Sequence, residues 1–485
     1  MYFKKRNIGR LCCLSMLFIL LCANLQAQEP LRLSPDEAVQ MALRSNLSLE
    51  SSRASVETRR RVSQMSWNQF IPNVMVTGTL MRDNEASTAA GMRQVEWNPI
   101  FGLGGYNQSD FELTTPYGTA YSWFMPFSID LPQWRIAHTI QVSLNLSLAM
   151  FENMNRLQLD YETGLLTYEK AKAQLERDVR KAYHNMLLLQ ENIALLRGSF
   201  ASVDRQVQIA QANYNAGLAP ELTLLQARVA RENMRPVIDQ AENGLKLSMA
   251  QFAMFLGLDY DTPFELIPVT DNIEFIPFDV AEMISKAASG KPDIQELRHT
   301  IMMLESARKA QSLALLPTLS LSWNNNSVFI RDPWKDPWFN GDNWRNSGSF
   351  NITMAIRLHS FLPWSTDNQG IKNMDDQIRA ATIGLAQMIN GTEIEVYNIV
   401  LALERTRVSA EALAQTVSLA EQAYRLTETA YRAGLQDYFQ VQNAEQSLRQ
   451  AQVQMLEQQF NYLNSLIDLE YATGVPFGTL SGRSR

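Results

Sequence analysis

Residues 214–218 read Tyr-Asn-Ala-Gly-Leu, and residues 431–435 return to the same pattern as Tyr-Arg-Ala-Gly-Leu. The two segments lie about 217 positions apart, and a second pair of glycines, Gly257 and Gly474, keeps the same offset. A fixed offset of this kind is typical of a duplicated structural unit. The sequence therefore predicts two structural repeats joined by a link.

Each repeat contains a long stretch whose apolar residues keep a seven-residue rhythm, with spacings that alternate between four and three. This rhythm predicts a coiled-coil seam with left-handed supercoiling. The first seam comprises Leu175, Val179, Ala182, Met186, Leu189, Ile193, Leu196, Phe200, Val203, Val207, Ala210 and Tyr214. The second comprises Val396, Ile399, Leu403, Ala410, Leu413, Val417, Ala420, Tyr424 and Tyr431, with Thr406 and Thr427 as polar interruptions. Apolar residues beside the seams predict that each helix packs against more than one neighbour.

The predicted helices match one another in length. The long ones, at 153–216 and 371–433, would each measure about 95 Å at 1.5 Å per residue. The shorter stretches 35–70 and 222–256 would each measure about 52 Å, so two of them stacked match one long helix. Each repeat is therefore expected to place one long helix beside two stacked shorter ones, with a glycine of positive φ at the reversal.

Between the helical stretches the apolar period changes to 2, which predicts β-strands. The first insert opens at Pro72 and the second at Pro317, and each is expected to form two strands with one apolar and one polar face. The apolar rows are Val74, Val76 and Leu80; Val142, Leu144, Leu146 and Leu148; Leu319, Leu321 and Trp323; and Phe350, Ile352, Met354, Ile356 and Leu358. Four strands with open edges cannot cross a lipid bilayer alone, so copies of the chain must pool their strands.

Tryptophans gather in the two inserts, which hold every one of them except Trp67. Trp67 itself lies just before the first insert. Aromatic girdles at the rims of an outer-membrane barrel produce this bias. For the run from Asp332 to Trp338, we favour the interpretation that these are ordinary loop residues.

The first residues have the layout of a signal peptide, with basic residues up to Arg10, an apolar segment at 11–21 and a small residue at Ala27. All three cysteines, including Cys22, lie in this segment, so the mature chain is expected to have no thiol. Leu21 is not the small residue that precedes a lipidated cysteine, so lipidation is not predicted.

Composition argues against several classes of function. The formal net charge is -7, and no basic stripe points to nucleic acid. The four histidines lack metal-ligand spacing, and no phosphate-binding glycine loop or nucleophile elbow is present. We therefore predict no enzyme activity and no catalytic, cofactor-binding or metal-binding residues.

The signal peptide, the duplicated helix–hairpin–helix plan and the Tyr-x-x-Gly-Leu turns together resemble the TolC family of outer-membrane efflux proteins. The resemblance covers nearly all of the mature chain. It implies a mainly α protein with a membrane β-barrel, working as a homotrimer with a trimeric α-barrel and a shared 12-stranded β-barrel. It also implies location in the outer membrane with a long periplasmic extension, contact with outer-membrane lipid, and two partners: a periplasmic adaptor (membrane fusion protein) and an inner-membrane transporter.

The expected domain organisation follows from the repeat and the resemblance. A signal peptide at 1–27 precedes a first repeat at 28–258, whose hairpin lies at about 71–150. An equatorial link at 259–277 leads to a second repeat at 278–474, whose hairpin lies at about 317–365. A tail at 475–485 ends the chain.

The two turns are the candidate partner-docking site, formed by Tyr214, Gly217, Leu218, Tyr431, Gly434 and Leu435. Each leucine follows an exposed reversal, which suggests a partner surface. The tyrosines continue the seams, so core packing is the alternative for them. Family members commonly carry aspartate six positions after the turn glycine. Thr223 and Gln440 stand there in this chain, so an acidic, cation-binding constriction is not carried over.

The function that these features predict is the exit duct of a tripartite efflux or type I secretion system. The alternative is a periplasmic coiled-coil adaptor, or a structural envelope protein without a channel. An adaptor shares the long helical hairpins but lacks paired amphipathic strands between them. The inner-membrane pump, rather than the duct, is expected to choose the cargo.

Overall fold

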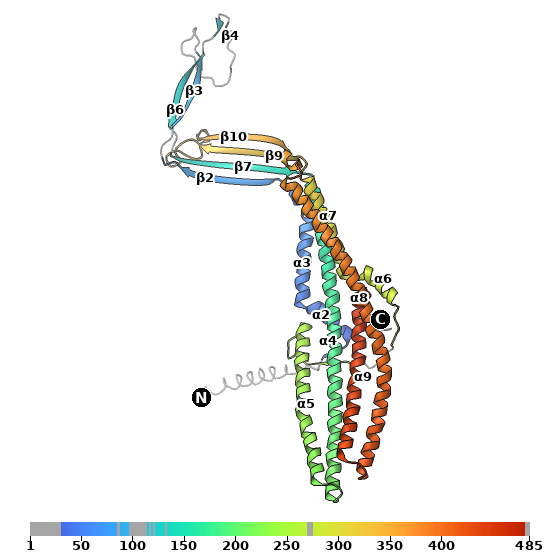
Figure 1. The fold of residues 1–485 in the computed structure, drawn as a ribbon. Coiled ribbons are helices and arrows are strands. Elements are labelled where there is room, and N and C mark those ends of the chain that lie inside the picture. Colours follow the sequence, from blue (N-terminus) through green and yellow to red (C-terminus); the bar gives the residue numbers. More distant parts are fainter. Residues whose placement is uncertain are drawn as a thin grey trace, which may run out of the picture. The chain divides into compact units, whose positions relative to one another are not determined.

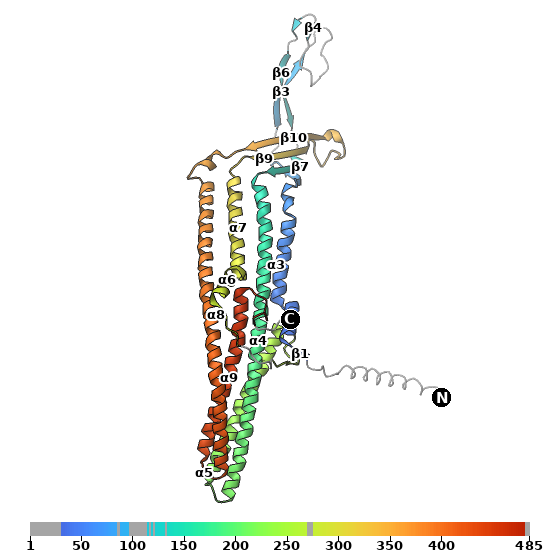
Figure 2. The ribbon, with the colours of Figure 1, turned by 90° about the vertical axis from the view of Figure 1, so that its right-hand side faces the viewer.

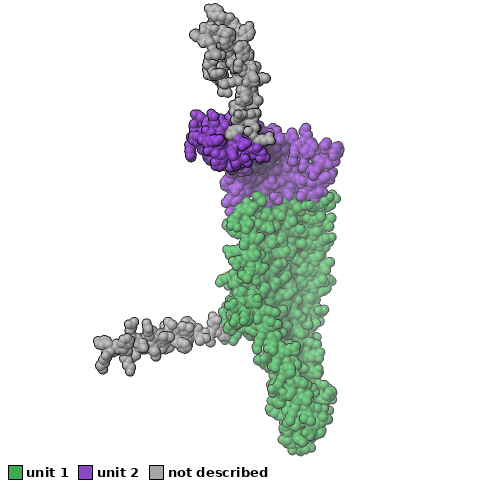
Figure 3. All heavy atoms as spheres, turned by 90° about the vertical axis from the view of Figure 1, so that its left-hand side faces the viewer, with its two compact units in different colours: residues 1–63, 157–305, 376–485 green, residues 64–156, 306–375 purple. Residues whose placement is uncertain are grey.

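A computed structural model describes residues 31–84, 88–96, 114–115, 118–119, 122–130, 133–268 and 275–480. The predicted signal peptide lies outside these ranges, as does Trp97. The chain divides into two compact units, coloured separately in Figure 3. Unit 1 comprises Met1–Ser63, Leu157–Glu305 and Asp376–Arg485, and unit 2 comprises Gln64–Arg156 and Ser306–Asp375.

Long helices dominate unit 1 (Figures 1 and 2). Helices α4 (Ala149–Asn215) and α8 (Thr366–Arg432) have 67 residues each, which confirms the two long helices predicted from the heptad rhythm. Helices α5 (Glu221–Phe255) and α9 (Tyr438–Thr473) return from their ends. Among the described residues, no helix combines the length and the apolarity needed to cross a membrane.

The shorter helical stretch near the N-terminus is broken rather than continuous. It consists of α2 (Pro35–Ser45), α3 (Leu47–Gln64) and the 3-10 helix η1 (Ser66–Phe70). The break occurs at Asn46 because its side-chain oxygen accepts hydrogen bonds from the backbone N–H groups of Ser48 and Leu49, which caps the new helix. The counterpart in the second half is α6 (Val280–Gly290) followed by α7 (Pro292–Leu313).

Apart from Tyr214, which is exposed, the residues of the two predicted seams are buried or half-buried in unit 1. Val179 and Val396 are fully buried, and the largest core cluster gathers apolar side chains of α2, α4, α5 and α9. Two short strands that sequence patterns did not predict, β1 (Leu31–Leu33) and β8 (Phe264–Leu266), pair in parallel beside this cluster. The N-terminal segment and the inter-repeat link are therefore joined by backbone hydrogen bonds.

Unit 2 contains a four-stranded antiparallel sheet of order β10-β9-β7-β2. Its strands are β2 (Asn73–Arg82), β7 (Trp134–Leu146), β9 (Thr318–Phe329) and β10 (Trp344–Ala355), so each insert contributes two strands to this sheet. The prediction of two strands holds for the second insert, but the first insert contains four more. β7 pairs with β9, so the two inserts share one sheet, a pairing that the sequence did not predict. Two further ribbons lie within the first insert: β3 (Thr88–Glu96) with β6 (Ser122–Asp130), and β4 (Thr114–Thr115) with β5 (Gly118–Thr119).

Candidate functional site

The two predicted turns have the same backbone structure. In the first, the N–H of Leu218 donates to the carbonyl of Asn213 at 2.8 Å, and Gly217 has φ 71°. In the second, the N–H of Leu435 donates to the carbonyl of Ala430 at 2.9 Å, and Gly434 has φ 72°. This arrangement satisfies carbonyls at the end of each long helix and requires the left-handed conformation that glycine adopts without strain.

Exposure separates the turn leucines from one of the tyrosines. Leu218 is 73% exposed and Leu435 is 79% exposed, so neither contributes to the core of the single chain. Tyr214 is also exposed, whereas Tyr431 is buried. Core packing therefore describes Tyr431 but not Tyr214.

One apolar cluster brings the two helical hairpins together near their turns. It contains Tyr431 and Tyr438, whose rings lie 6.2 Å apart, together with Val207, Ala210, Leu224, Ala227, Tyr424 and Val441. Both turns therefore lie at the same end of unit 1. Burial raises the pKa of Tyr438 to about 12, and the hydroxyl groups of Tyr424, Tyr431 and Tyr438 find no hydrogen-bond partner in the described part of the chain. The spacing of seven residues between these tyrosines could have indicated the cluster from the sequence.

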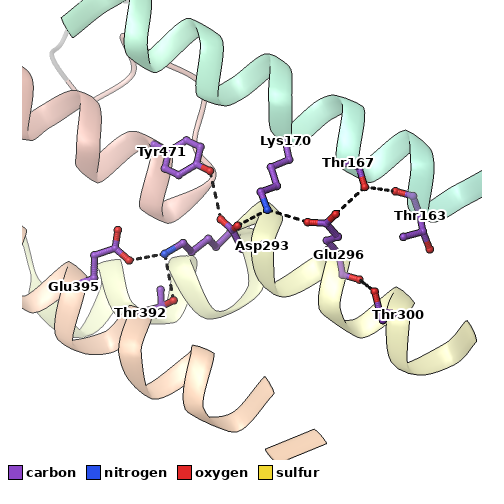
Figure 4. Close-up of polar contacts among 10 residues, drawn as sticks. Thr163, Thr167, Lys170, Asp293, Glu296, Thr300, Thr392, Glu395 and Tyr471 are labelled. Atoms are coloured by element: carbon purple, nitrogen blue, oxygen red, sulfur yellow. Dashed lines mark hydrogen bonds and ion pairs between the residues drawn. The ribbon is translucent and has the colours of Figure 1, made fainter. Parts of the chain in front are cut away.

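A charged network farther along unit 1 joins α4, α7 and α9 (Figure 4). The ammonium group of Lys170 lies 2.7 Å from Asp293 and 2.9 Å from Glu296, and the hydroxyl of Tyr471 donates to Asp293. Burial disfavours the charged form of Lys170, but its two carboxylate partners outweigh this effect and raise its pKa. Heptad analysis missed this network because its members come from three separate helices.

A buried phenol fastens the paired short strands to α4. The hydroxyl of Tyr183 lies 2.8 Å from the carbonyl oxygen of Leu33 and 2.7 Å from that of Ile267. These two carbonyls follow the paired strands β1 and β8. Burial raises the pKa of Tyr183 to about 12, so the phenol remains a hydrogen-bond donor at neutral pH.

The sheet of unit 2 has one apolar face and one polar face. Its register places Val74, Val142, Trp323 and Phe350 in one row across all four strands. The same face carries Val76, Leu80, Ile136, Ile140, Leu144, Leu146, Leu319, Leu321, Phe329, Ile352 and Met354. The other face carries Thr77, Thr79, Thr139, Gln141, Ser143, Asn145, Ser320, Ser322, Asn324, Asn326, Ser347, Ser349, Asn351 and Thr353. The predicted alternation is therefore confirmed for most of the predicted rows, whereas Leu148, Ile356 and Leu358 lie outside the strands. Toward the β9–β10 loop the apolar face also carries polar residues, namely His138, Asn325, Ser327 and Asn346, and the polar face carries Met75 and Val328.

Aromatic side chains gather at the end of the sheet where the β9–β10 loop lies. Trp134 and Trp334 meet edge to face at 5.9 Å, and the guanidinium of Arg82 lies 5.6 Å from the Trp134 ring. In the loop, the indole N–H of Trp338 donates to the carbonyl of Pro333, and that of Trp344 donates to the carbonyl of Trp338. Trp334 and Trp338 lie in the β9–β10 loop, in agreement with the interpretation of this run as loop residues, and the hydrogen bond of Trp338 helps to order that loop.

Within the ranges that the structure describes, no group of three or more His, Cys, Asp or Glu side chains is placed to hold a metal ion. Carboxylates such as Asp293, Glu296 and Glu395 pair with lysines instead. The chemistry available here is that of surfaces, an amphipathic sheet and exposed helical turns.

The chain is similar to outer-membrane proteins of efflux and secretion systems in both sequence and fold. The family model described as "Outer membrane efflux protein" matches residues 38–258 and 283–475. A relative, "Probable efflux pump outer membrane protein TtgC" of Pseudomonas putida, is 24% identical over 354 residues, which is 69% of each chain. "Alkaline protease secretion protein AprF" of Pseudomonas aeruginosa is 22% identical over 350 residues, again 69% of each chain. Among solved structures, CusC has a TM-score of 0.69 at 15% identity and covers 91% of this chain and 92% of its own.

Proposed function

This chain belongs to the outer membrane efflux protein family, and from that premise we propose how its copies assemble into the exit duct of a tripartite efflux or secretion machine. The chain is an outer-membrane export channel, in a family of channel and transport proteins. The proposal concerns which surfaces of this chain close the channel and which surfaces bind its partners.

The observation that carries the proposal is the open, two-faced sheet. Its edge strands β2 and β10 pair with no further strand among the described residues. Open edges are not tolerated in lipid, because unpaired backbone groups there cost several kcal/mol each. If β2 of one copy pairs with β10 of the next, three copies give a closed barrel of 12 strands, with the apolar face toward lipid and the polar face toward the lumen.

Exposed apolar stripes on the helices of unit 1 support the same assembly. Helix α8 exposes Ile394, Tyr397, Leu401 and Val408 at spacings of three, four and seven, on a different face from its buried seam. Helix α5 exposes Leu222, Leu225, Val229 and Val237. Large exposed apolar stripes mark interaction surfaces. We assign them to contacts between neighbouring copies that form the helical barrel.

The exposed turns supply the surface for a second kind of partner. Leu218 and Leu435 are the apolar groups that each long hairpin presents at its reversal. We assign this end of unit 1 to a periplasmic adaptor, through which an inner-membrane transporter delivers cargo. The relatives include an efflux pump outer membrane protein and an alkaline protease secretion protein, so both efflux and protein secretion are represented among them.

Cysteine cross-linking of the edge strands tests the assembly. In the double variant Thr77→Cys, Asn351→Cys, the two thiols lie on the polar face of β2 and β10. A short bis-maleimide should give covalent dimers and trimers in outer-membrane fractions. The matched variant Thr139→Cys, Asn351→Cys uses the central strand β7 and should give none. A monomer in the soluble fraction, or equal ladders from both variants, would contradict the proposed barrel.

A further inference from the structure

Three features of unit 2 meet at one end of its sheet: a cation, an aromatic pair and the apolar face. Arg82 is the last residue of β2, and its register partner is Trp134, the first residue of β7. Trp334 of the β9–β10 loop packs edge to face against Trp134 and is 64% exposed. Leu80 and Ile136 are the next pair on the same face, and beyond the Gly78–His138 pair the apolar surface resumes with Val76 and Ile140.

The charge of Arg82 is not neutralised within the described part of the chain, where it forms no ion pair. The neighbouring carboxylate Asp83 lies against Arg135, and Asp332 of the loop pairs with Lys335. Arg331, also exposed, adds a second cation to the same loop. A guanidinium over an indole keeps its fork of N–H donors free for an anion, because the ring contacts only its face.

We propose that Arg82, Trp134 and Trp334 form a binding site for the phosphorylated headgroup of an outer-leaflet glycolipid. The proposal rests on the assembly above, in which the apolar face meets lipid. At the end of an apolar band about ten residues long, a lipid places its headgroup level with the terminal side chains. Arg82 would bind a phosphate oxygen through paired N–H donors, and the exposed ring of Trp334 would pack against a sugar face.

The sheet itself supplies a matched control. Arg345 is an exposed arginine near the same end of the sheet, but its register partner is Val328 and it lies on the polar face. It would therefore face the lumen of the assembled barrel. Arg82→Gln and Arg345→Gln remove the same charge from the chain, so a difference between them reports position rather than net charge.

Native mass spectrometry of the purified, detergent-solubilised oligomer tests the site. Its probes are a bis-phosphorylated lipid A and the same lipid without phosphates. We expect Arg82→Gln to weaken retention of the phosphorylated lipid by about tenfold and Trp334→Ala to weaken retention of both lipids, while Arg345→Gln stays at the wild-type level. Inorganic phosphate at equal concentration should not compete, because it lacks the acyl chains that hold the lipid against the apolar face.

Equal retention by Arg82→Gln and wild type would overturn the site, and so would equal losses in both arginine variants. Competition by inorganic phosphate would reassign the site to a free anion. The same spectra report the number of chains in each oligomer. A trimer without phosphate preference would therefore refute only the lipid site, whereas a monomer would refute the assembly on which it rests.

Discussion

The hydroxyl of Tyr183 lies 2.7 Å from the carbonyl oxygen of Ile267, so a phenol buried within α4 holds the segment that joins the two halves of the chain. The same hydroxyl also reaches the carbonyl of Leu33. One side chain on α4 thereby contacts both the segment before α2, at Leu33, and the segment after α5, at Ile267. The stability of this part of unit 1 should therefore depend on the Tyr183 hydroxyl.

Tyr183→Phe should therefore destabilise unit 1. Removing the hydroxyl deprives the carbonyl oxygen of Ile267 of its phenol donor, which costs about 1–3 kcal/mol, whereas the carbonyl of Leu33 still accepts from the backbone N–H of Ile267. Thermal unfolding of the purified oligomer measures the loss, and Tyr260→Phe, at an exposed tyrosine of the link, is the matched control. A variant that melts with wild type would show that water replaces the phenol.

The pH dependence of the same contact has a definite sign. The pKa of Tyr183 is raised to about 12 in the folded chain, from 10.0 for an ordinary tyrosine. The folded state therefore favours the neutral phenol, and its contribution is complete below pH 10 and is lost as pH rises toward 12. The melting temperatures of wild type and Tyr183→Phe should converge over this interval, whereas a constant gap would argue against the assigned burial.

Glu470 provides a second test of how stability depends on pH. It is buried near the end of α9, where its carboxylate accepts the backbone N–H groups of Gly478 and Leu480, both at 2.9 Å. Burial raises its pKa, so the folded state binds a proton more readily than the unfolded state. Its contribution to stability is therefore greatest in acid and declines as pH rises through the raised pKa.

Glu470→Gln keeps an oxygen acceptor but carries no charge. The variant should not lose stability as pH rises. Its melting temperature should therefore increase relative to that of wild type between acid and neutral pH. Glu470→Leu removes the acceptor and should free the tail, which limited proteolysis would detect. Parallel melting curves for wild type and Glu470→Gln would show that the carboxylate is better solvated than its burial indicates.

The seam can be tested at its most buried positions. Val396 is fully buried in α8, whereas Leu196 and Leu413, at equivalent predicted seam positions, are half-buried. An aspartate at Val396 would place an unpaired charge in the core and cost several kcal/mol. Protease resistance of the helical unit should fall most for Val396→Asp and less for Leu196→Asp and Leu413→Asp. Gln415→Asp, at an exposed position of α8, should leave it unchanged.

Helix length and the four strands of the shared sheet could be predicted because each depends on a local period: 3.5 residues along α4 and α8, and 2 along β2 and β9. The β3–β6 and β4–β5 ribbons of the first insert were not predicted. Local periods could not predict three other features: the β7–β9 pairing, the Lys170 network and the Tyr183 contact. They join residues far apart in sequence whose types are individually common, so no spacing marks them. The turn leucines follow from the glycine pattern, but the difference in burial between Tyr214 and Tyr431 arises from packing against Tyr438.

The turns are where a mutation should separate assembly from export. Leu218 and Leu435 are more than two-thirds exposed, and each is held by a backbone N–H bond that does not depend on its side chain. The double change Leu218→Asp, Leu435→Asp should therefore preserve the turns, oligomer yield and outer-membrane insertion. Two charges at an apolar docking surface would cost enough desolvation energy to prevent adaptor binding.

Cargo efflux from cells, together with cross-linking of the duct to its adaptor, measures this effect. Leu47→Asp is the control, because Leu47 is 79% exposed at the start of α3 and lies outside the turns. We expect the double variant to lose both efflux and cross-linking while Leu47→Asp retains both. If the double variant exports cargo and cross-links like wild type, the turns only reverse the chain, and the adaptor must bind elsewhere on the helices.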